Sequence, residues 1–360
     1  MTKIKVSEKN IASVSLKINQ TGKTKRRKKM FTEKSTFEEI LSYPGMAALE
    51  KFIMQQPVEG QEDTVGPAPE EMKKITLKML ASAVSPAWNP RSMEKGFNAI
   101  AAHLDADVPM KQEIYSSEEK KADPTKERTG LLWFPAEKKG PFALVCAGGA
   151  YMSVASLVEA FPVADRLNEL GVTAFVLQYR AGVKGAAEKS GEDLRRALKF
   201  ILDQREKFHV EEGYAAFGFS AGGHLVSELG TDNEGYKVYG LPKPQMLGLC
   251  YPLVAFAQED EQMENCLNIM FEDGDREQMK EHFTPVEHLS RDYPKTFIWQ
   301  TVEDEQVPFE ANGHEIYRRL QKLGVPSKLK TVQHGLHGLG LGEDSEAEGW
   351  LDEAVEYWRS

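Results

Sequence analysis

The stretch AAFGFSAGGH, residues 215–224, decides the fold class. Its first half, Ala215–Phe219, is apolar and β-rich, which predicts a strand, and the residues after Ser220 predict a helix. The G-x-S-x-G pattern places Ser220 in a strained strand-to-helix turn, where Gly218 and Gly222 let the two elements approach closely. Such a turn lifts the hydroxyl above the sheet at a helix N-terminus, whose dipole favours negative charge. The alternative is an ordinary capping serine, and partners elsewhere in the chain must decide between the two.

Strand and helix patterns alternate on both sides of this turn. The predicted strands are Gln112–Ser116, Gly130–Phe134, Phe142–Ala147, Thr173–Tyr179, Ala215–Phe219, Met246–Tyr251, Thr296–Thr301 and Lys328–Val332. The predicted helices are Val154–Leu170, Gly191–Phe208, Ala221–Leu229, Phe309–Leu323 and Glu346–Arg359. Central strands such as Phe142–Cys146 are apolar on both faces, as a sheet covered by helices requires. The alternation predicts an α/β fold with a mostly parallel, doubly wound sheet and helices on both faces.

A helical region precedes this alternation. Apolar residues recur at helical spacing in four segments that proline and glycine separate. These segments are Phe37–Leu41, which Ser35 or Thr36 can cap, 45–55, 70–84 and 91–104. We therefore predict a basic, disordered tail at 1–30, a helical N-terminal leader or cap region at 31–110 and an α/β body at 111–360.

Charge and cysteine content narrow the classes of function. Residues 1–30 carry ten Lys or Arg and one acid, whereas the whole chain has a net charge of −10. The acidic remainder would repel phosphate, so we expect no nucleic-acid partner. No stretch approaches the ~18 apolar residues of a membrane span, and no secretory signal is apparent. The three cysteines, Cys146, Cys250 and Cys266, lie among apolar neighbours, which indicates reduced thiols, no metal site and a cytoplasmic location.

A serine hydroxyl is a weak nucleophile until a base removes its proton, and histidine suits that task near neutral pH. Two loops that follow predicted strands offer the partners: VEDEQVP at 302–308 and HGLHGLG at 334–340. The acid is ambiguous on chemistry alone because three acids are consecutive, although the D-x-x-V-P setting favours Asp304. His334 and His337 compete as the base. Their i, i+3 spacing could also suggest a metal, but the flanking glycines argue against a helix and no carboxylate motif accompanies them.

Acyl transfer to such a serine also needs backbone N–H groups aimed at the developing oxyanion. Ala221, directly after Ser220, can supply one donor. The loop after the strand Phe142–Cys146 reads AGGAY, residues 147–151, and can supply the other from Gly149 or Ala150. Glycine in this loop lets the backbone approach a substrate closely. The alternative is a simple strand-to-helix turn.

With these pieces in register, residues 110–360 resemble the esterase and lipase type of the α/β-hydrolase superfamily. The likeness is greatest to the bacterial acetyl-esterase group labelled as acetylxylan or feruloyl esterase-like. The segments that carry it are AGGAY at 147–151, FVLQYR at 175–180, GFSAGGH at 218–224, TFIWQT at 296–301, DEQVP at 304–308 and HGLGL at 337–341. The resemblance implies an α/β-hydrolase fold, with Asp304 as the acid and His337 as the base. Ala150 departs from the pattern, because a third glycine is usual there.

The resemblance implies a serine carboxylic-ester hydrolase that forms an acyl-serine intermediate at Ser220 and needs no cofactor or metal. Expected substrates are small molecules, short-chain, acetyl-like esters that can belong to carbohydrates, and a homo-oligomer is possible. The body at 111–360 is then the catalytic domain, with 256–293 as a cap insertion. Its apolar cluster, Cys266–Phe271, could line a pocket or form helix core, and the helical spacing favours core. We expect His224 to be structural. Two rivals stay open: a serine peptidase of the prolyl-oligopeptidase type, and a catalytically silent binding protein of the same fold.

Overall fold

The computed structural model describes residues 30–54 and 69–360. The tail predicted at 1–30 lies outside the described residues except for Met30, and so does the last residue of the segment 45–55. Among the described residues, no helix is long and apolar enough to cross a membrane. A cytoplasmic location and the lack of a nucleic-acid partner stay predictions.

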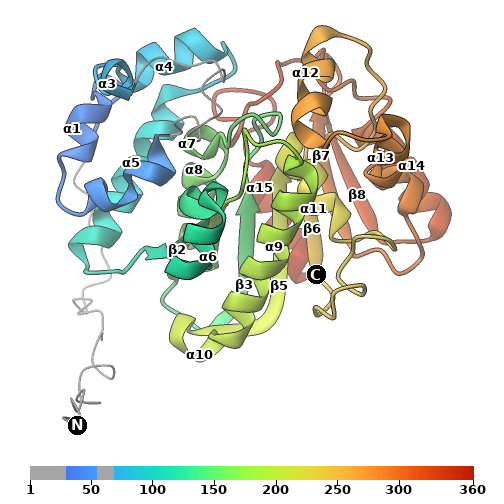
Figure 1. The fold of residues 1–360 in the computed structure, drawn as a ribbon, viewed down its shortest axis with the longest axis horizontal. Helices are drawn as coiled ribbons and strands as arrows, with labels where there is room; N and C mark the ends of the chain where they lie inside the picture. Colours follow the sequence, from blue (N-terminus) through green and yellow to red (C-terminus); the bar gives the residue numbers. More distant parts are fainter. Residues whose placement is uncertain (1–29, 55–68) are drawn as a thin grey trace.

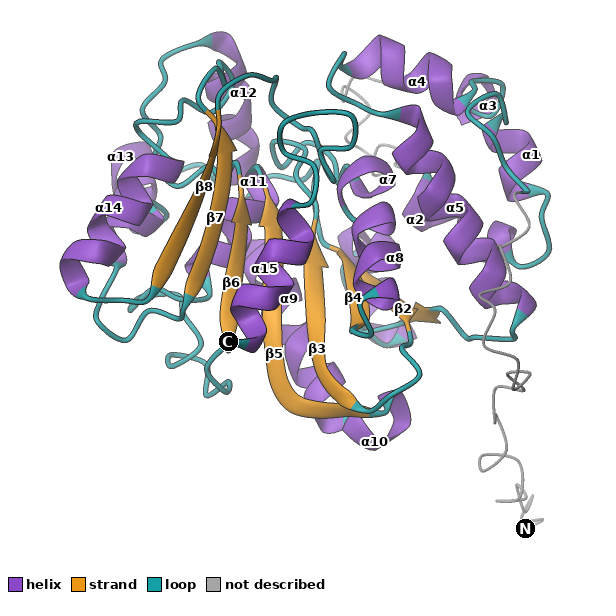
Figure 2. Cartoon of the chain, turned by 180° about the vertical axis from the view of Figure 1, so that it is seen from behind, coloured by secondary structure: helices purple, strands orange, loops and turns teal. Residues whose placement is uncertain are grey.

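The described residues form one eight-stranded sheet with the order β1-β2-β4-β3-β5-β6-β7-β8. Its strands are β1 (Lys111–Gln112), β2 (Gly130–Phe134), β3 (Gly140–Cys146), β4 (Thr173–Gln178), β5 (Val210–Phe219), β6 (Met246–Cys250), β7 (Thr296–Thr301) and β8 (Ser327–Val332). Strands β3 to β8 pair in parallel, and only the pairings of β1 with β2 and of β2 with β4 are antiparallel. The predicted mostly parallel α/β sheet is confirmed, and its strands run side by side in Figure 2.

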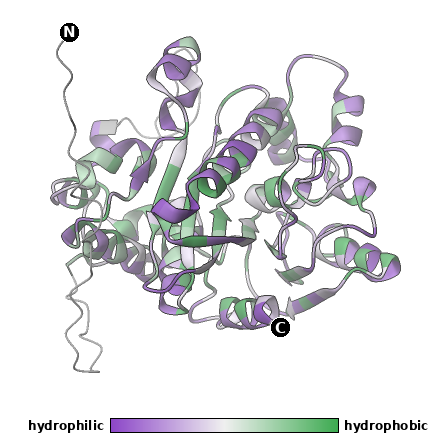
Figure 3. Cartoon of the chain, turned by 90° about the horizontal axis from the view of Figure 1, so that it is seen from below, coloured by the Kyte–Doolittle hydropathy of each residue, from purple (hydrophilic) through white to green (hydrophobic). Residues whose placement is uncertain are grey.

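Helices cover both faces of the sheet. Around the sheet lie α7 (Ser156–Glu159), α8 (Phe161–Glu169), α9 (Ala186–Asp203), α10 (Arg205–Phe208), α11 (Ala221–Glu228), α14 (Gly313–Leu323) and α15 (Trp350–Arg359). Helices α9 and α11 cover the face that is nearer in Figure 1, and α8 and α15 cover the face that is nearer in Figure 2. Hydrophobic and hydrophilic residues share the helices in bands (Figure 3), as expected for helices with one buried side.

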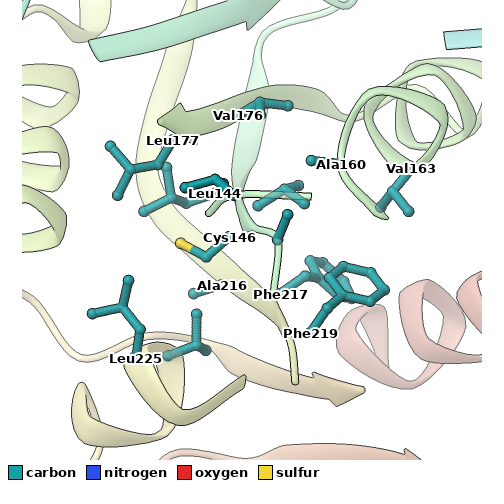
Figure 4. Close-up of a cluster of buried hydrophobic side chains, with 14 of the residues drawn as sticks. Leu144, Cys146, Ala160, Val163, Val176, Leu177, Ala216, Phe217, Phe219 and Leu225 are labelled. Atoms are coloured by element: carbon teal, nitrogen blue, oxygen red, sulfur yellow. The ribbon is translucent and has the colours of Figure 1, made fainter. Parts of the chain in front are cut away.

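The core lies where β3, β4 and β5 meet these helices. Phe217 and Phe219 project from β5 toward Val163 of α8, and their rings also contact Trp350 of α15 (Figure 4). Cys146 points to the opposite face of the sheet in the same view. All of these side chains are fully buried. Because successive residues of a strand point to opposite faces, this packing fixes the direction in which each strand delivers its last residue.

Several predicted elements differ at their ends. The predicted helix Val154–Leu170 is broken at Ala160 into α7 and α8, because Pro162 has no N–H for the helical ladder and can stand only in a first turn. The C-terminal helix begins at Trp350 and not at Glu346, since Gly349 takes a positive φ of 83°. Helix α14 likewise starts at Gly313 instead of Phe309, and the helix predicted from Gly191 starts earlier, at Ala186.

The strand predicted over Gln112–Ser116 is also wrong beyond its first residue. Ser116 instead caps a helix that the sequence reading missed, α6 (Ser117–Ala122), followed by η2 (Pro124–Arg128). The Ser116 side chain accepts from the Glu119 N–H, and the Glu119 side chain accepts from the Ser116 N–H. This capping box was visible in the sequence as S-x-x-E.

The leader at 31–110 is helical where it is described. It contains α1 (Phe37–Leu41), η1 (Met46–Leu49), α2 (Glu50–Ile53), α3 (Pro69–Met72), α4 (Leu77–Val84) and α5 (Pro90–Asp105). Helix α5 lies along α8, where the rings of Phe97 and Phe161 meet edge to face at 6.1 Å between their centroids. At Gly96 a Cβ atom would stand only 2.8 Å from the Phe161 Cβ, so a glycine permits this close approach. The leader is therefore packed against the body through a shared hydrophobic core.

Candidate active site

Ser220 stands between β5 and α11 with φ 52° and ψ −118°, so the strained turn predicted from G-x-S-x-G is confirmed. Its N–H donates to the Cys250 carbonyl at 3.0 Å, which ties the turn to the end of β6. A Cβ atom at Gly218 would collide with the Gly222 carbonyl, and one at Gly222 with the Cys146 carbonyl. The two glycines are therefore required by close backbone contacts.

Two side chains from distant loops complete a hydrogen-bonded chain with Ser220. The Nε2 atom of His337 lies 2.8 Å from the Ser220 Oγ, and its Nδ1 lies 2.7 Å from the Asp304 Oδ2. The side chain of His337 is 9% exposed and that of Asp304 is fully buried. The other oxygen of Asp304 accepts the N–H groups of Gln306 and Val307 at 3.1 and 2.8 Å. The carboxylate is thus held in one orientation by its own loop. The three residues follow β5, β7 and β8, at the carboxyl edge of the sheet.

The other histidines that could serve as the base, His334 and His224, are not part of this hydrogen-bonded group. His334 is 73% exposed and pairs with Glu303, whose carboxylate raises the pKa of that imidazole. His224 is buried, its Nδ1 lies 2.7 Å from the Tyr151 hydroxyl, and its Nε2 lies 2.7 Å from the Phe283 carbonyl. Because a carbonyl only accepts, Nε2 carries the proton and Nδ1 accepts from the tyrosine. Burial lowers the pKa of His224 to about 4, so the ring is neutral and structural, as predicted.

The loop after β3 brings backbone donors next to Ser220. Gly149, Ala150 and Tyr151 all have positive φ, at 125°, 53° and 57°. Within the described part of the chain, the N–H groups of Gly149, Ala150 and Ala221 donate to no protein acceptor, and all three residues line the same cavity as Ser220. The predicted oxyanion donors and the nucleophile are therefore brought together, with alanine standing at a left-handed position that glycine would occupy more easily.

This cavity has a volume of about 390 Å³ and three walls. The leader contributes Val84, Ser85 and Trp88. The loop after β3, called the oxyanion loop below, contributes Met152, Ser153 and Ala155, and the last residue of α7 contributes Glu159. The segment 256–293 contributes Gln258, Asp260, Gln262, Met263 and Cys266. The last segment contains α12 (Glu261–Met270), α13 (Arg276–His282) and η3 (Pro285–His288). In the predicted cluster Cys266–Phe271, Leu267 and Met270 are buried on α12, as helix core requires, and Phe271 is buried just after the helix ends. Cys266 is buried as well and also lines the cavity, which was the alternative interpretation.

Sequence reasoning missed Trp88 and Glu159. Trp88 lies beside the loop at 334–340 that carries His337, called the histidine loop below. A Cβ atom at Gly338 in this loop would be 3.5 Å from the Trp88 Nε1. No local motif marks either residue, because each becomes part of the site only when distant segments pack together. Only the prolines on either side of Trp88, at positions 86 and 90, indicate that it lies in a loop between helices.

The sequence profile of the BD-FAE family matches residues 132–320. This chain belongs to that family. The chain is also 25% identical over 215 residues to an acetylxylan esterase of Xylanibacter ruminicola and over 217 residues to an endo-1,4-beta-xylanase B of Butyrivibrio fibrisolvens. These alignments cover 59% and 58% of this chain but 44% and 34% of those proteins, so the chain spans less than half the length of these relatives.

Solved structures of similar fold agree with the family. An acetyl ester-xyloside bifunctional hydrolase from Caldicellulosiruptor lactoaceticus is 28% identical with a TM-score of 0.60, over 69% of this chain and 95% of that one. A carboxylesterase from Lactobacillus plantarum is 21% identical with a TM-score of 0.55, over 64% of this chain and 91% of that one. The predicted resemblance is confirmed, because this protein belongs to the esterase group of α/β-hydrolases. The profile begins at residue 132, so the leader lies outside it.

Proposed function

We propose that this protein is a serine carboxylic-ester hydrolase that acts through an acyl-serine intermediate on short-chain, acetyl-like esters. The observation that carries the proposal is the continuous series of hydrogen bonds from Ser220 through His337 to Asp304. It is set in a cavity that also presents N–H groups for which the described residues provide no acceptor. These groups together supply a nucleophile, a general base, an orienting carboxylate and oxyanion donors.

In the proposed mechanism, the Ser220 Oγ attacks the ester carbonyl carbon while the His337 Nε2 takes its proton. The Asp304 carboxylate stabilises the imidazolium, and the N–H groups of Ala221 and of Gly149 or Ala150 bind the oxyanion. The imidazolium then protonates the leaving alcohol, which leaves an acyl group on Ser220. Water attacks this acyl group with His337 again as base, and the acid departs.

We propose an acetylated carbohydrate as the substrate. The relatives named as an acetylxylan esterase and an acetyl ester-xyloside hydrolase support this choice. The cavity supports it as well, because its volume of about 390 Å³ is at the small end of the ~300–1,000 Å³ usual for small-molecule sites. Trp88 offers an apolar ring face, and Gln258, Asp260 and Gln262 offer hydrogen bonds for hydroxyl groups.

We further propose that two segments outside the sheet act as walls of a catalytic domain at 111–360. The leader at 31–110 supplies one wall through the end of α4 and Trp88, and the cap segment 256–293 supplies the other through α12. Because α5 packs on α8, we propose that the leader is a fixed wall and not a mobile lid.

Substitution of the nucleophile tests the proposal. Ser220→Ala is compared with Ser117→Ala, an exposed serine in the first turn of α6, for hydrolysis of p-nitrophenyl acetate and labelling by a fluorophosphonate probe. We expect Ser117→Ala to match the wild type and Ser220→Ala to lose labelling and at least ~10³-fold in kcat. Retained turnover in Ser220→Ala would refute the assignment. A series of longer acyl esters and a peptide panel separate a short-chain esterase from a lipase or a peptidase.

A further inference from the structure

A buried carboxylate that the mechanism does not use lies close to the nucleophile. Glu159 ends α7 and is only 3% exposed, yet it lines the same cavity as Ser220. Its Oε2 accepts the Gly148 N–H at 2.6 Å, and its Oε1 accepts the Tyr251 hydroxyl at 2.9 Å. A Cβ atom at Gly148 would be 2.7 Å from the Ser220 Cβ and 3.0 Å from this carboxylate, so the three groups meet at one point.

Tyr251 extends this connection to the histidine loop. Its hydroxyl oxygen accepts the Gly340 N–H at 3.0 Å, and its ring meets the ring of His337 edge to face at 4.9 Å between centroids. Tyr251 itself has φ 38°, directly after β6. One carboxylate therefore joins the oxyanion loop, the end of β6 and the loop that carries the base.

The hydrogen bonds of Glu159 favour its ionised form. Both of its oxygens accept from donors, whereas a protonated carboxyl would need an acceptor for its own proton. Burial raises the pKa of Glu159, but the Gly148 N–H, the imidazole of His337 and the Tyr251 hydroxyl each favour the charged form. Among its neighbours, Tyr179, Cys250 and Tyr251 stay neutral because burial raises the pKa of each well above its usual range. His337 is then the neighbour whose charge changes during the reaction.

We infer that Glu159 is a positioning residue of the active site, which fixes the oxyanion loop through Gly148 and the loop of His337 through Tyr251, and which adds a second carboxylate beside Asp304 to stabilise the imidazolium formed during the reaction. The inference rests on the proposed ester hydrolysis for its kinetic consequence. Its electrostatic consequence does not, because a charge near the imidazole changes proton affinity whether or not the protein turns over an ester.

The test uses Glu159→Gln, which keeps the size of the side chain and removes its charge. Glu94→Gln is the control: Glu94 is also a buried glutamate that accepts a backbone N–H, from Glu33, but it lies on α5 away from the cavity. The imidazole resonances of His337 are titrated by NMR in each protein and assigned with His337→Gln. We expect the midpoint to fall by at least ~0.5 pH unit in Glu159→Gln and to stay in place in Glu94→Gln. An unmoved midpoint in Glu159→Gln would overturn the electrostatic role.

Kinetics on p-nitrophenyl acetate test the positioning role. We expect kcat to fall about tenfold in Glu159→Gln with KM within about twofold, and the acid limb of kcat/KM to move to lower pH. Tyr251→Phe removes the bridging hydroxyl and keeps the charge, so it should lower kcat while moving the acid limb less. Wild-type kcat in both variants, in an assay where Ser220→Ala is inactive, would overturn the inference and leave the proposed function standing. Activity retained in Ser220→Ala would instead refute the proposed function, and the NMR titration would still decide the role of Glu159.

Discussion

Replacing Asp304 by asparagine should remove nearly all activity because of how the carboxylate is held. Oδ1 accepts two N–H groups, from Gln306 and Val307, and Oδ2 accepts the Nδ1–H of His337. An asparagine that keeps its oxygen on the two N–H groups must turn its NH₂ group toward His337. The Nδ1 atom must then accept, so the proton moves to Nε2, which can no longer accept from Ser220.

The opposite amide orientation is costly. It would place the NH₂ group against the N–H groups of Gln306 and Val307 and leave both donors without an acceptor, at roughly 1–3 kcal/mol each. The wrong tautomer is therefore favoured, and we expect kcat to fall by about 10⁴ at neutral pH, which corresponds to ~5.5 kcal/mol in the barrier.

The assay is hydrolysis of p-nitrophenyl acetate by Asp304→Asn, with thermal unfolding to show that the variant is folded. Glu303→Gln is the matched control, because Glu303 is exposed and pairs with His334 outside the chain of three residues. We expect the control to stay within about twofold of the wild type, as a surface ion pair contributes little. If Asp304→Asn kept more than a tenth of the activity, the tautomer argument and the choice of Asp304 as the acid would both be wrong.

Two further predictions concern the substrate and the stability. Trp88→Ala should raise KM for an acetylated xylo-oligosaccharide roughly tenfold and leave p-nitrophenyl acetate unchanged, whereas an equal effect on both substrates would contradict a sugar-binding role. Burial and then Glu234 raise the pKa of Glu228 well above its usual range, so the folded state keeps a proton that the unfolded state releases near pH 4.3. The contribution of Glu228 to the free energy of unfolding is therefore complete below about pH 4.3. It is lost as the pH rises toward the pKa of the folded state, at about 1.4 kcal/mol per pH unit. Glu228→Gln should therefore gain stability over the wild type between pH 5 and 9 in urea unfolding, and a constant difference would refute this.

The parts of the site that could be predicted are those set by neighbouring residues. The turn at Ser220 follows from the glycines two residues before and two residues after it, because a Cβ atom at Gly218 would collide with the carbonyl of Gly222, only four residues away. Asp304 and His337 could be narrowed to short loops, because the carboxyl ends of parallel strands share one edge of the sheet. Chemistry alone could not exclude Glu303 as the acid or His334 as the base. The pair Asp304 and His337 is buried and the pair Glu303 and His334 is exposed, and this difference depends on the complete fold.

The parts that could not be predicted depend on contacts between distant segments. Trp88 enters the site because α5 packs on α8, an interface between the leader and the body that no pattern in either segment specifies. Glu159 reads in the sequence as one more acid in a helix, and only the break at Ala160 ends α7 where its carboxylate meets Gly148. The helix starts that differ from the prediction are marked in the sequence, because Pro162 can stand only in the first turn of a helix and Gly349 can take the positive φ that precedes α15.

The strained residues of the structure explain why local preferences fail where the site is built. Of the seven non-glycine residues with positive φ in the described part of the chain, one is the proposed nucleophile, Ser220, and three more, Ala150, Tyr151 and Tyr251, lie in the loops beside it. Each such conformation costs on the order of 1–3 kcal/mol unless its surroundings compensate. Hydrogen bonds hold three of them: the Tyr151 hydroxyl to His224, the Ser220 N–H to Cys250, and the Tyr251 hydroxyl to Glu159. At Tyr151, Ser220 and Tyr251, glycine would relieve the strain but would supply neither the hydroxyls nor the rings that connect the loops, so the network needs residues that local propensity disfavours.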